Sequence, residues 1–221
     1  ASPSTVDTDL QSNKRKMKLG VWFMVWIGSV LLSALVMLVA YLAPAAEIAV
    51  SSKSPPGFLL VWTRYSAHLA FVFLLLAFSA STLKAAKNNA QTRGLVRYRR
   101  QLGLGFATAH TFHLVALVLF LSHLEGYSVD ASVAVAGFGY VVTALLAATS
   151  NDYSVKRLGP AKWKQLHTIG ISILMLYFFV AFFSRLLTNF VPIYALYVAL
   201  IATAVVAKLR VKRHNVTAAT G

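Results

Sequence analysis

Long apolar runs separated by short polar and basic stretches dominate the pattern of this chain. A membrane-spanning helix needs about 20 consecutive, mostly apolar residues, and six segments reach or approach that length. They are Leu19–Ala43, Phe58–Leu83, Leu102–His123, Ala131–Thr149, Leu166–Leu187 and Val191–Ala207. Because backbone groups in lipid must find hydrogen-bond partners within their own segment, all six are predicted as α-helices. We therefore expect an all-α membrane protein, a bundle of six transmembrane helices.

The composition supports this class and excludes others. Of the 221 residues, 58% are hydrophobic and only 12% are charged, whereas soluble domains carry about a quarter charged residues. The net charge of +15 does not indicate a nucleic-acid-binding protein, because the basic residues lie between apolar spans and not on one soluble face. The absence of cysteine excludes disulfides and thiolate metal sites. We expect a polar and basic tail at 1–18, a transmembrane domain at 19–207 and a basic tail at 208–221.

The basic residues predict the orientation of the bundle. Most of them lie in four segments: before the first span, and after the second, fourth and sixth spans. Because the chain crosses the membrane at each span, these four segments lie on the same side. Lys53, Arg64 and Arg185 are the exceptions. Since lysine and arginine are enriched in cytoplasmic loops, both termini are predicted to be cytoplasmic.

Four histidines lie within the apolar spans, where a polar side chain is costly unless it has a partner or a function. They are His68 in the second span, His110 and His113 in the third, and His167 near the start of the fifth. A rise of 1.5 Å per residue puts the first three near mid-membrane and His167 closer to the cytoplasmic face. His110 and His113 are three residues apart and share roughly one helix face.

The chemistry of these histidines points to haem iron more than to other ligands. Outside the N-terminal tail, the carboxylates are Glu47, Glu125, Asp130 and Asp152, and all four lie in loops. A proton relay normally includes a buried carboxylate, and a catalytic zinc site would lack its base. Neutral imidazoles on facing helices of an apolar bundle suit haem best. A histidine in a span can also simply bond a serine, threonine or carbonyl of a neighbouring helix.

Aromatic and basic residues could complete such a haem site. Aromatic side chains that could pack a porphyrin are Phe71, Phe73, Phe106, Phe112, Tyr177, Phe178 and Phe179. Arg99 and Arg100, at the cytoplasmic edge of the third span, could pair with haem propionates. Lipid contact or core packing for the aromatics, and interfacial anchoring for the arginines, are the alternative interpretations.

Three stretches resemble a known family. They are RRQLGLGFATAHTFH at 99–113, LLAATS at 145–150 and LGPAKWKQLH at 158–167. These stretches are similar to the third helix, the end of the fourth and the start of the fifth in ferric-reductase-like transmembrane domains. Within that family the chain most resembles the haem-binding membrane subunit of the bacterial methionine sulfoxide reductase system, which has six spans and no flavin domain. The resemblance covers about 58–207.

The resemblance implies b-type haem, one or two groups, between the third and fifth helices. His113 matches the outer third-helix ligand and His167 matches the inner fifth-helix histidine. Arg99 matches an arginine that replaces the inner third-helix histidine of the larger oxidases. The resemblance also implies a function: an electron-transfer subunit of the bacterial inner membrane, which works with a redox protein or within a larger membrane complex. Electrons would pass from a cytoplasmic reductase or quinol to an acceptor outside.

One position departs from the family pattern. The second fifth-helix histidine would fall at Val180, which cannot bind iron. Either His113 pairs with another imidazole, with His68 at the right depth, or the haem lies lower, between His110 or His113 and His167. A five-coordinate haem and a relative without haem are further alternatives.

Two other functions compete with electron transfer. Val180 favours a degenerate relative that acts as a structural or assembly subunit of a larger complex. A transporter is less favoured, because paired Gly/Pro-broken spans are not evident in the sequence. A flavin or a quinone stays open as a further cofactor, although no motif supports either, and no motif indicates a nucleotide.

Overall fold

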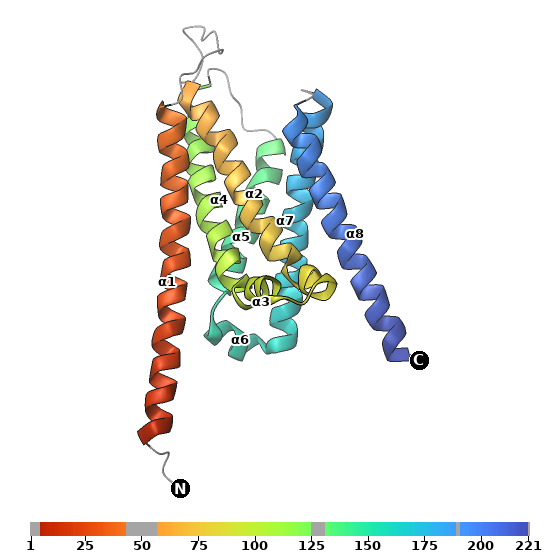
Figure 1. The fold of residues 1–221 in the computed structure, drawn as a ribbon. Coiled ribbons are helices and arrows are strands. Elements are labelled where there is room, and N and C mark those ends of the chain that lie inside the picture. Colours follow the sequence, from red (N-terminus) through yellow and green to blue (C-terminus); the bar gives the residue numbers. More distant parts are fainter. Residues whose placement is uncertain (1–4, 43–56, 125–130, 189–190, 221) are drawn as a thin grey trace.

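The computed structural model describes the backbone of residues 5–42, 57–124, 131–188 and 191–220, and the side chains of 23–42, 57–124, 134–188 and 191–213. Within these residues every regular element is an α-helix (Figure 1). In chain order the helices are α1 (Thr5–Leu42), α2 (Gly57–Ala86), α3 (Ala90–Arg97), α4 (Arg99–Ser122), α5 (Ala131–Ala148), α6 (Asp152–Leu158), α7 (Pro160–Thr188) and α8 (Pro192–Thr220). The all-α prediction is confirmed.

Five helices in the described part of the chain are long and apolar enough to cross a membrane. They comprise Phe23–Leu42, Gly57–Ala86, Arg99–Ser122, Pro160–Thr188 and Pro192–Arg213. The predicted fourth span corresponds to α5, of which Ala134–Ala148 meets the same test only together with Asp152–Leu158, across a bend of 95°. The chain is therefore a multi-pass membrane protein with five such helices, or six if the bent pair forms one span.

Two short helices occupy connections that the sequence predicts only as basic loops. At the start of α3, the Asn89 side chain accepts a hydrogen bond from the backbone N–H of Thr92 at 2.9 Å, and Thr92 Oγ1 accepts one from Asn89 N–H at 3.1 Å. These reciprocal bonds satisfy N–H groups that a helix start otherwise leaves unpaired. Helices α3 and α6 lie across the same end of the bundle as the start of α1 and the end of α8 (Figure 1).

The ends of the chain are more helical than the predicted tails. Helix α1 begins at Thr5 and α8 continues to Thr220, so helix extends into both terminal segments, 1–18 and 208–221.

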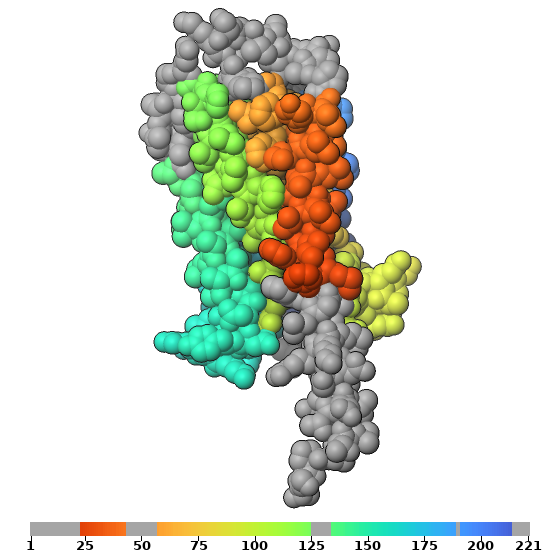
Figure 2. All heavy atoms as spheres, turned by 90° about the vertical axis from the view of Figure 1, so that its left-hand side faces the viewer, coloured from red at the N-terminus to blue at the C-terminus, as the bar shows by residue number. Residues whose placement is uncertain are grey.

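Helix α2 is central to the packing, since it contacts α1, α3, α4, α7 and α8. Helix α1 lies against α4 on one face of the molecule, with α5 on the other side of α4 (Figure 2). The main core is rich in buried aromatic side chains from α2, α4 and α7, including Phe71, Phe78, Phe106, Phe178 and Phe182. A smaller core around Trp62 joins α1, α2 and α4.

Two glycines allow neighbouring helices to approach closely. A Cβ at Gly105 of α4 would lie 3.0 Å from the Phe73 ring of α2. A Cβ at Gly170 of α7 would lie 2.7 Å from Leu146 Cδ2 of α5. Association of helices in lipid relies on such close van der Waals packing, because lipid removes the hydrophobic drive between them. These contacts determine which faces of α2, α4, α5 and α7 point toward the interior of the bundle.

The outer faces of the helices carry large apolar side chains. On α1, for example, Met24 is 65% exposed and Leu31 is 63% exposed, and on α7 Leu176 is 60% exposed. Such a surface is unfavourable in water and suits contact with lipid chains. The bundle is thus apolar both inside and outside, which makes its few buried polar groups informative.

Candidate functional site

Two adjoining cavities lie inside the bundle. The first, called here the histidine cavity, encloses about 180 Å³ and is lined by His68, His110 and His113 among others. The second, the arginine cavity, encloses about 340 Å³, and its lining includes Arg99, Arg100 and His167. Leu174 of α7 lines both cavities, so that they follow one another along the bundle. The arginine cavity lies toward the end that carries α3 and α6.

Helix α4 contributes two stacked imidazoles to the histidine cavity. The rings of His110 and His113 have centroids 5.6 Å apart and planes inclined by 27°. On α5, the Tyr140 ring lies 4.3 Å from His110 with an inclination of 18°. Phe106, one turn earlier on α4, stacks on His110 at 5.0 Å. Aromatic contacts therefore fix the plane of the buried His110 ring.

A hydrogen bond across the bundle bears on the tautomer of His113. Its Nδ1 lies 3.2 Å from Ser66 Oγ on α2, and Ser66 Oγ also lies 3.1 Å from the Thr63 carbonyl, which can only accept. When the Ser66 hydroxyl donates to that carbonyl, Ser66 Oγ accepts from His113, and the Nδ1 of His113 carries the proton. In a neutral imidazole the lone pair is then on Nε2, the arrangement found where a second protein group orients a metal-binding histidine.

The same cavity contains two buried polar atoms that lack a partner. His110 Nδ1 and Thr63 Oγ1 are both shielded from solvent, and neither has a hydrogen-bond partner in the described part of the chain. Both residues line the histidine cavity. Because buried polar atoms are normally hydrogen-bonded, such a pair indicates a place for water or for a ligand.

His68 enters the cavity from α2 within a ring of aromatic side chains. Its ring lies 5.2 Å from Tyr197 of α8 and 6.1 Å from Tyr194, both in edge-to-face geometry. Phe182 of α7 lies 6.3 Å away. The structure thus brings His68 to the cavity that contains His113, although 45 positions separate them in the sequence.

The arginine cavity combines cationic and aromatic groups. Arg99 Nε donates to the Ala77 carbonyl of α2 at 2.9 Å. Arg100 forms an ion pair of 2.6 Å with Asp152, and its guanidinium lies 5.7 Å from the Trp163 ring. Each arginine therefore already has a protein partner that holds its position at the cavity.

His167 belongs to the arginine cavity and presents a different nitrogen from His113. Its Nε2 lies 3.1 Å from Thr149 Oγ1, and the Thr149 hydroxyl donates to the Leu145 carbonyl at 2.7 Å. By the same reasoning, His167 donates through Nε2, and its lone pair is on Nδ1. The Trp163 ring stacks on His167 with a centroid distance of 4.2 Å.

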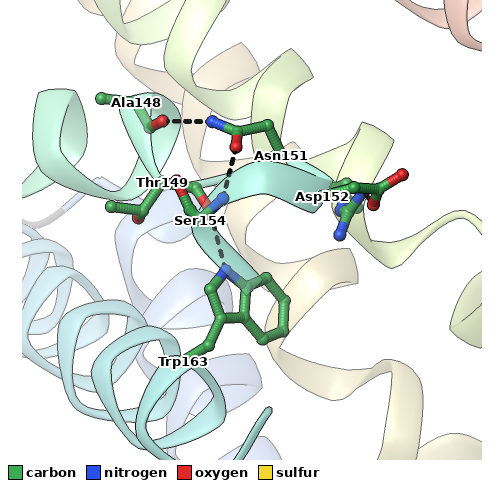
Figure 3. A network of polar contacts seen from close by, with 7 residues as sticks. Ala148, Thr149, Asn151, Asp152, Ser154 and Trp163 are labelled. Carbon is green, nitrogen blue, oxygen red and sulfur yellow. Dashed lines mark hydrogen bonds and ion pairs between the residues drawn. The ribbon is translucent and has the colours of Figure 1, made fainter. Parts of the chain in front are cut away.

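The corner between α5, α6 and α7 is held by hydrogen bonds to backbone groups (Figure 3). Asn151 donates through Nδ2 to the Ala148 carbonyl at 2.7 Å and accepts from the backbone N–H of Ser154 at 2.7 Å, which begins α6. Trp163 Nε1 donates to the Thr149 carbonyl at 2.8 Å. These bonds pin the start of α7, and with it His167, to the end of α5.

Glycine is required where α6 ends. Gly159 has φ +79° and ψ 149°, a backbone region that is essentially restricted to glycine. Pro160 follows as the first residue of α7, the helix position that proline suits best.

The six site residues predicted from the sequence thus divide into two groups. His68, His110 and His113 line one cavity, and Arg99, Arg100 and His167 line the other. Val180, at the family's second fifth-helix position, is 57% exposed and lines neither cavity. Of the aromatic candidates, Phe106, Tyr177 and Phe178 line a cavity.

The sequence interpretation missed several residues of the histidine cavity. Thr63, Arg64 and Ser66 precede His68 on α2, and all but Ser66 line the cavity directly. Their signal in the sequence was the density of polar residues at 63–68 inside an apolar span. Tyr140 carried no such signal, because a tyrosine in a span is unremarkable until its neighbour is known.

No group of three or more histidine or carboxylate side chains converges on one point to form a metal-ion site among the described residues. Haem iron needs only one or two protein ligands, because the porphyrin supplies the others. No protein-family model matches the chain, and no solved structure matches it.

Proposed function

We propose that the chain is a haem b-binding membrane subunit for transmembrane electron transfer. The observation that carries the proposal is His113, a partly buried imidazole that lines a cavity and whose Nδ1 is hydrogen-bonded to Ser66, which leaves Nε2 for a ligand. The sequence resemblance to ferric-reductase-like domains supports the same residue as ligand. Electrons would come from a cytoplasmic reductase or quinol and go to an acceptor on the other side of a bacterial inner membrane, with both termini cytoplasmic.

The donor set of the histidine cavity fits haem iron. His68 and His110 lie in the same cavity as His113, and His110 Nδ1 has no partner in the described part of the chain. His68, on the neighbouring helix α2, can therefore serve as the second ligand, which Val180 cannot; His110 stacks on His113 on the same helix, so the two cannot bind one iron from opposite faces. At about 180 Å³ the cavity is smaller than the 300–1,000 Å³ of typical ligand sites. The cavity is partly open, and a porphyrin ligated by His113 would extend beyond it.

The arginine cavity supports a second site. Its volume of about 340 Å³ lies within the usual range, and His167 offers an imidazole there, with Arg99 and Arg100 as partners for propionates. To bind through Nε2, His167 would have to give up its bond to Thr149. His113 is accordingly the stronger ligand candidate of the two.

A bound haem supplies one-electron exchange between ferric and ferrous iron. The chain's own residues provide the surroundings for that exchange. Ser66 holds the His113 tautomer, while Phe106, Tyr140 and Phe178 form a dry aromatic wall around His110. Leu174 lines both cavities, so ligands in the two cavities would both contact this apolar side chain.

Haem content of histidine variants tests the proposal. Purified protein should show a Soret band and a reducible α band, and His113→Ala should lose most of the haem. His123→Ala is the matched control, because that exposed imidazole bonds only groups at the end of its own helix α4, the Leu119 carbonyl and the Ser122 hydroxyl. His68→Ala and His110→Ala identify the second ligand by which of them changes the spectrum. Wild-type protein that neither contains nor takes up haem would refute the function.

A structural or assembly subunit is the second candidate. The observation that favours it is the exposure of Val180 on α7, in line with Leu176, Phe183 and Leu187, which are also exposed. A partner helix could cover this apolar stripe in place of lipid. This alternative requires that the protein is free of haem and co-purifies with a membrane partner. Val180→Lys should weaken the interaction with that partner, and His113→Ala should not.

A further inference from the structure

Two arginines at the far rim of the histidine cavity depart from the charge pattern of the chain. Arg64 of α2 and Arg185 of α7 both line that cavity. They lie toward the end of the bundle opposite α3 and α6, where the sequence otherwise carries almost no basic residues. A guanidinium within a membrane span is costly, and its position usually reflects a function.

The two guanidinium groups lie just beyond the histidines. Arg64 precedes His68 by four residues, so it is one helical turn, about 6 Å, nearer the rim. Arg185 is three residues before the end of α7. Its Nη1 donates to the Tyr194 hydroxyl at 3.4 Å, and its guanidinium lies 6.0 Å from the Tyr194 ring. Tyr194 itself contacts His68, which links the arginine to the imidazole.

No carboxylate compensates these charges in the part of the chain whose side chains are described. There the single acidic residue is Asp152, which pairs with Arg100 at the other cavity. The arginines of the two cavities differ in how closely they are held, because Arg99 and Arg100 donate to oxygens at 2.9 Å and 2.6 Å, whereas the hydrogen bond of Arg185 to the Tyr194 hydroxyl is 3.4 Å long. Arg64 and Arg185 have the capacity to accept a negatively charged ligand group.

A guanidinium binds a carboxylate through two parallel N–H···O bonds, and haem carries two carboxylates on one edge. We propose that Arg64 and Arg185 bind the propionates of the haem ligated by His113. This inference rests on the proposed function and adds the direction of the haem to it. The propionate edge faces the rim formed by α2, α7 and α8, away from the arginine cavity. This proposal revises the interpretation of the sequence, in which Arg99 and Arg100 alone were the propionate partners.

The test compares haem b with its dimethyl ester, in which both carboxylates are blocked. Full-length apoprotein in detergent is titrated with each compound, and binding is read from the Soret band. Wild-type protein should bind the ester roughly 10- to 100-fold more weakly than haem b, the range expected for lost charged hydrogen bonds. In the double variant with Arg64→Gln and Arg185→Gln, the two compounds should bind within about twofold of each other. The double variant with Lys84→Gln and Lys87→Gln, at exposed positions outside both cavities, removes the same two positive charges and should behave as wild type.

The outcomes separate the two claims. If wild-type protein binds haem b and the ester equally, the arginines do not hold the propionates, and a lipid phosphate is their more suitable ligand. An ester penalty that persists in the double variant but disappears in a variant with Arg99→Gln and Arg100→Gln would place the propionates at the other cavity. If wild-type protein binds neither compound, the proposed function fails as well. The wild-type comparison needs no substitution, so it stands even where an arginine variant does not fold.

Discussion

Ser66 and His113, from neighbouring helices α2 and α4, share a hydrogen bond of 3.2 Å. When the Ser66 hydroxyl donates to the Thr63 carbonyl of its own helix, at 3.1 Å, the imidazole is the donor of this bond. A serine that is otherwise an ordinary helix residue thereby sets which nitrogen of His113 can meet a ligand. The pair connects helix packing to ligand chemistry, and it can be tested directly.

Ser66→Ala should weaken haem binding without abolishing it. Loss of an outer-shell partner typically costs about 10- to 100-fold in metal affinity, because the ligand is no longer held in the correct tautomer and orientation. The measurement is a haem titration followed at the Soret band.

Ser33→Ala is the control for this substitution, since Ser33 is equally buried and bonds only the Ser29 carbonyl within α1. If Ser66→Ala and Ser33→Ala bind haem alike, the tautomer argument is wrong.

Gly170→Ala should lower the stability of the bundle. The added Cβ would meet three atoms of Leu146 at 2.7 to 3.0 Å, and such overpacking costs about 1–3 kcal/mol. Thermal unfolding in detergent should therefore show a lower Tm for Gly170→Ala than for wild type.

Two further variants identify the cause. Gly28→Ala has nothing within 4 Å of the new Cβ, so the Tm should stay the same or rise through better helix propensity. Combining Gly170→Ala with Leu146→Ala should cost less than the sum of the single effects, because the clash is removed. Additive effects would contradict a direct contact between α5 and α7.

Lys208→Met should leave the stability unchanged or raise it. Lys208 Nζ is buried without a hydrogen-bond partner among the described residues. A cation–π contact offsets part of the cost of burying this charge, since Nζ lies 3.7 Å from the centroid of the Phe78 ring. A cation over an aromatic ring is worth about 2 kcal/mol when desolvated, whereas burying an ammonium costs several kcal/mol. Methionine retains the packing of the stem without that cost.

Thermal unfolding of Lys208→Met beside Lys212→Met, an exposed position on the same helix, measures the difference. A clear loss of stability in Lys208→Met alone would mean that the ammonium has an anionic partner in the membrane.

The orientation of the bundle can be tested because the chain has no cysteine. Asn88→Cys lies between α2 and α3, and Ser122→Cys lies at the far end of α4; both positions are exposed. With both termini cytoplasmic, a membrane-impermeant maleimide should label Ser122→Cys in intact spheroplasts and Asn88→Cys only in inverted vesicles. The opposite pattern would reverse the proposed orientation.

The sequence by itself determined the class of the protein and the course of its helices. Apolar length and the polar breaks between runs located the apolar part of five helices, because lipid leaves the backbone no alternative to helix. They did not give the full lengths, since α1 begins at Thr5 and α8 continues to Thr220. The fourth was harder, since α5 has 18 residues and a sharp bend of 95° separates it from α6. Helices α3 and α6 were not expected, because the side-chain caps of Asn89 and Asn151 that begin them are weak signals in a polar loop.

Only the tertiary structure decided which polar groups meet. The spans are apolar on nearly every side, so the sequence carries little information on how each helix is rotated about its axis. That rotation is set by contacts such as Gly105 against Phe73 and Gly170 against Leu146. It brings His68 and Ser66 of α2 to the cavity of His113 and leaves His167 with the arginines. Close packing between helices, which no pattern along one helix encodes, is the physical reason.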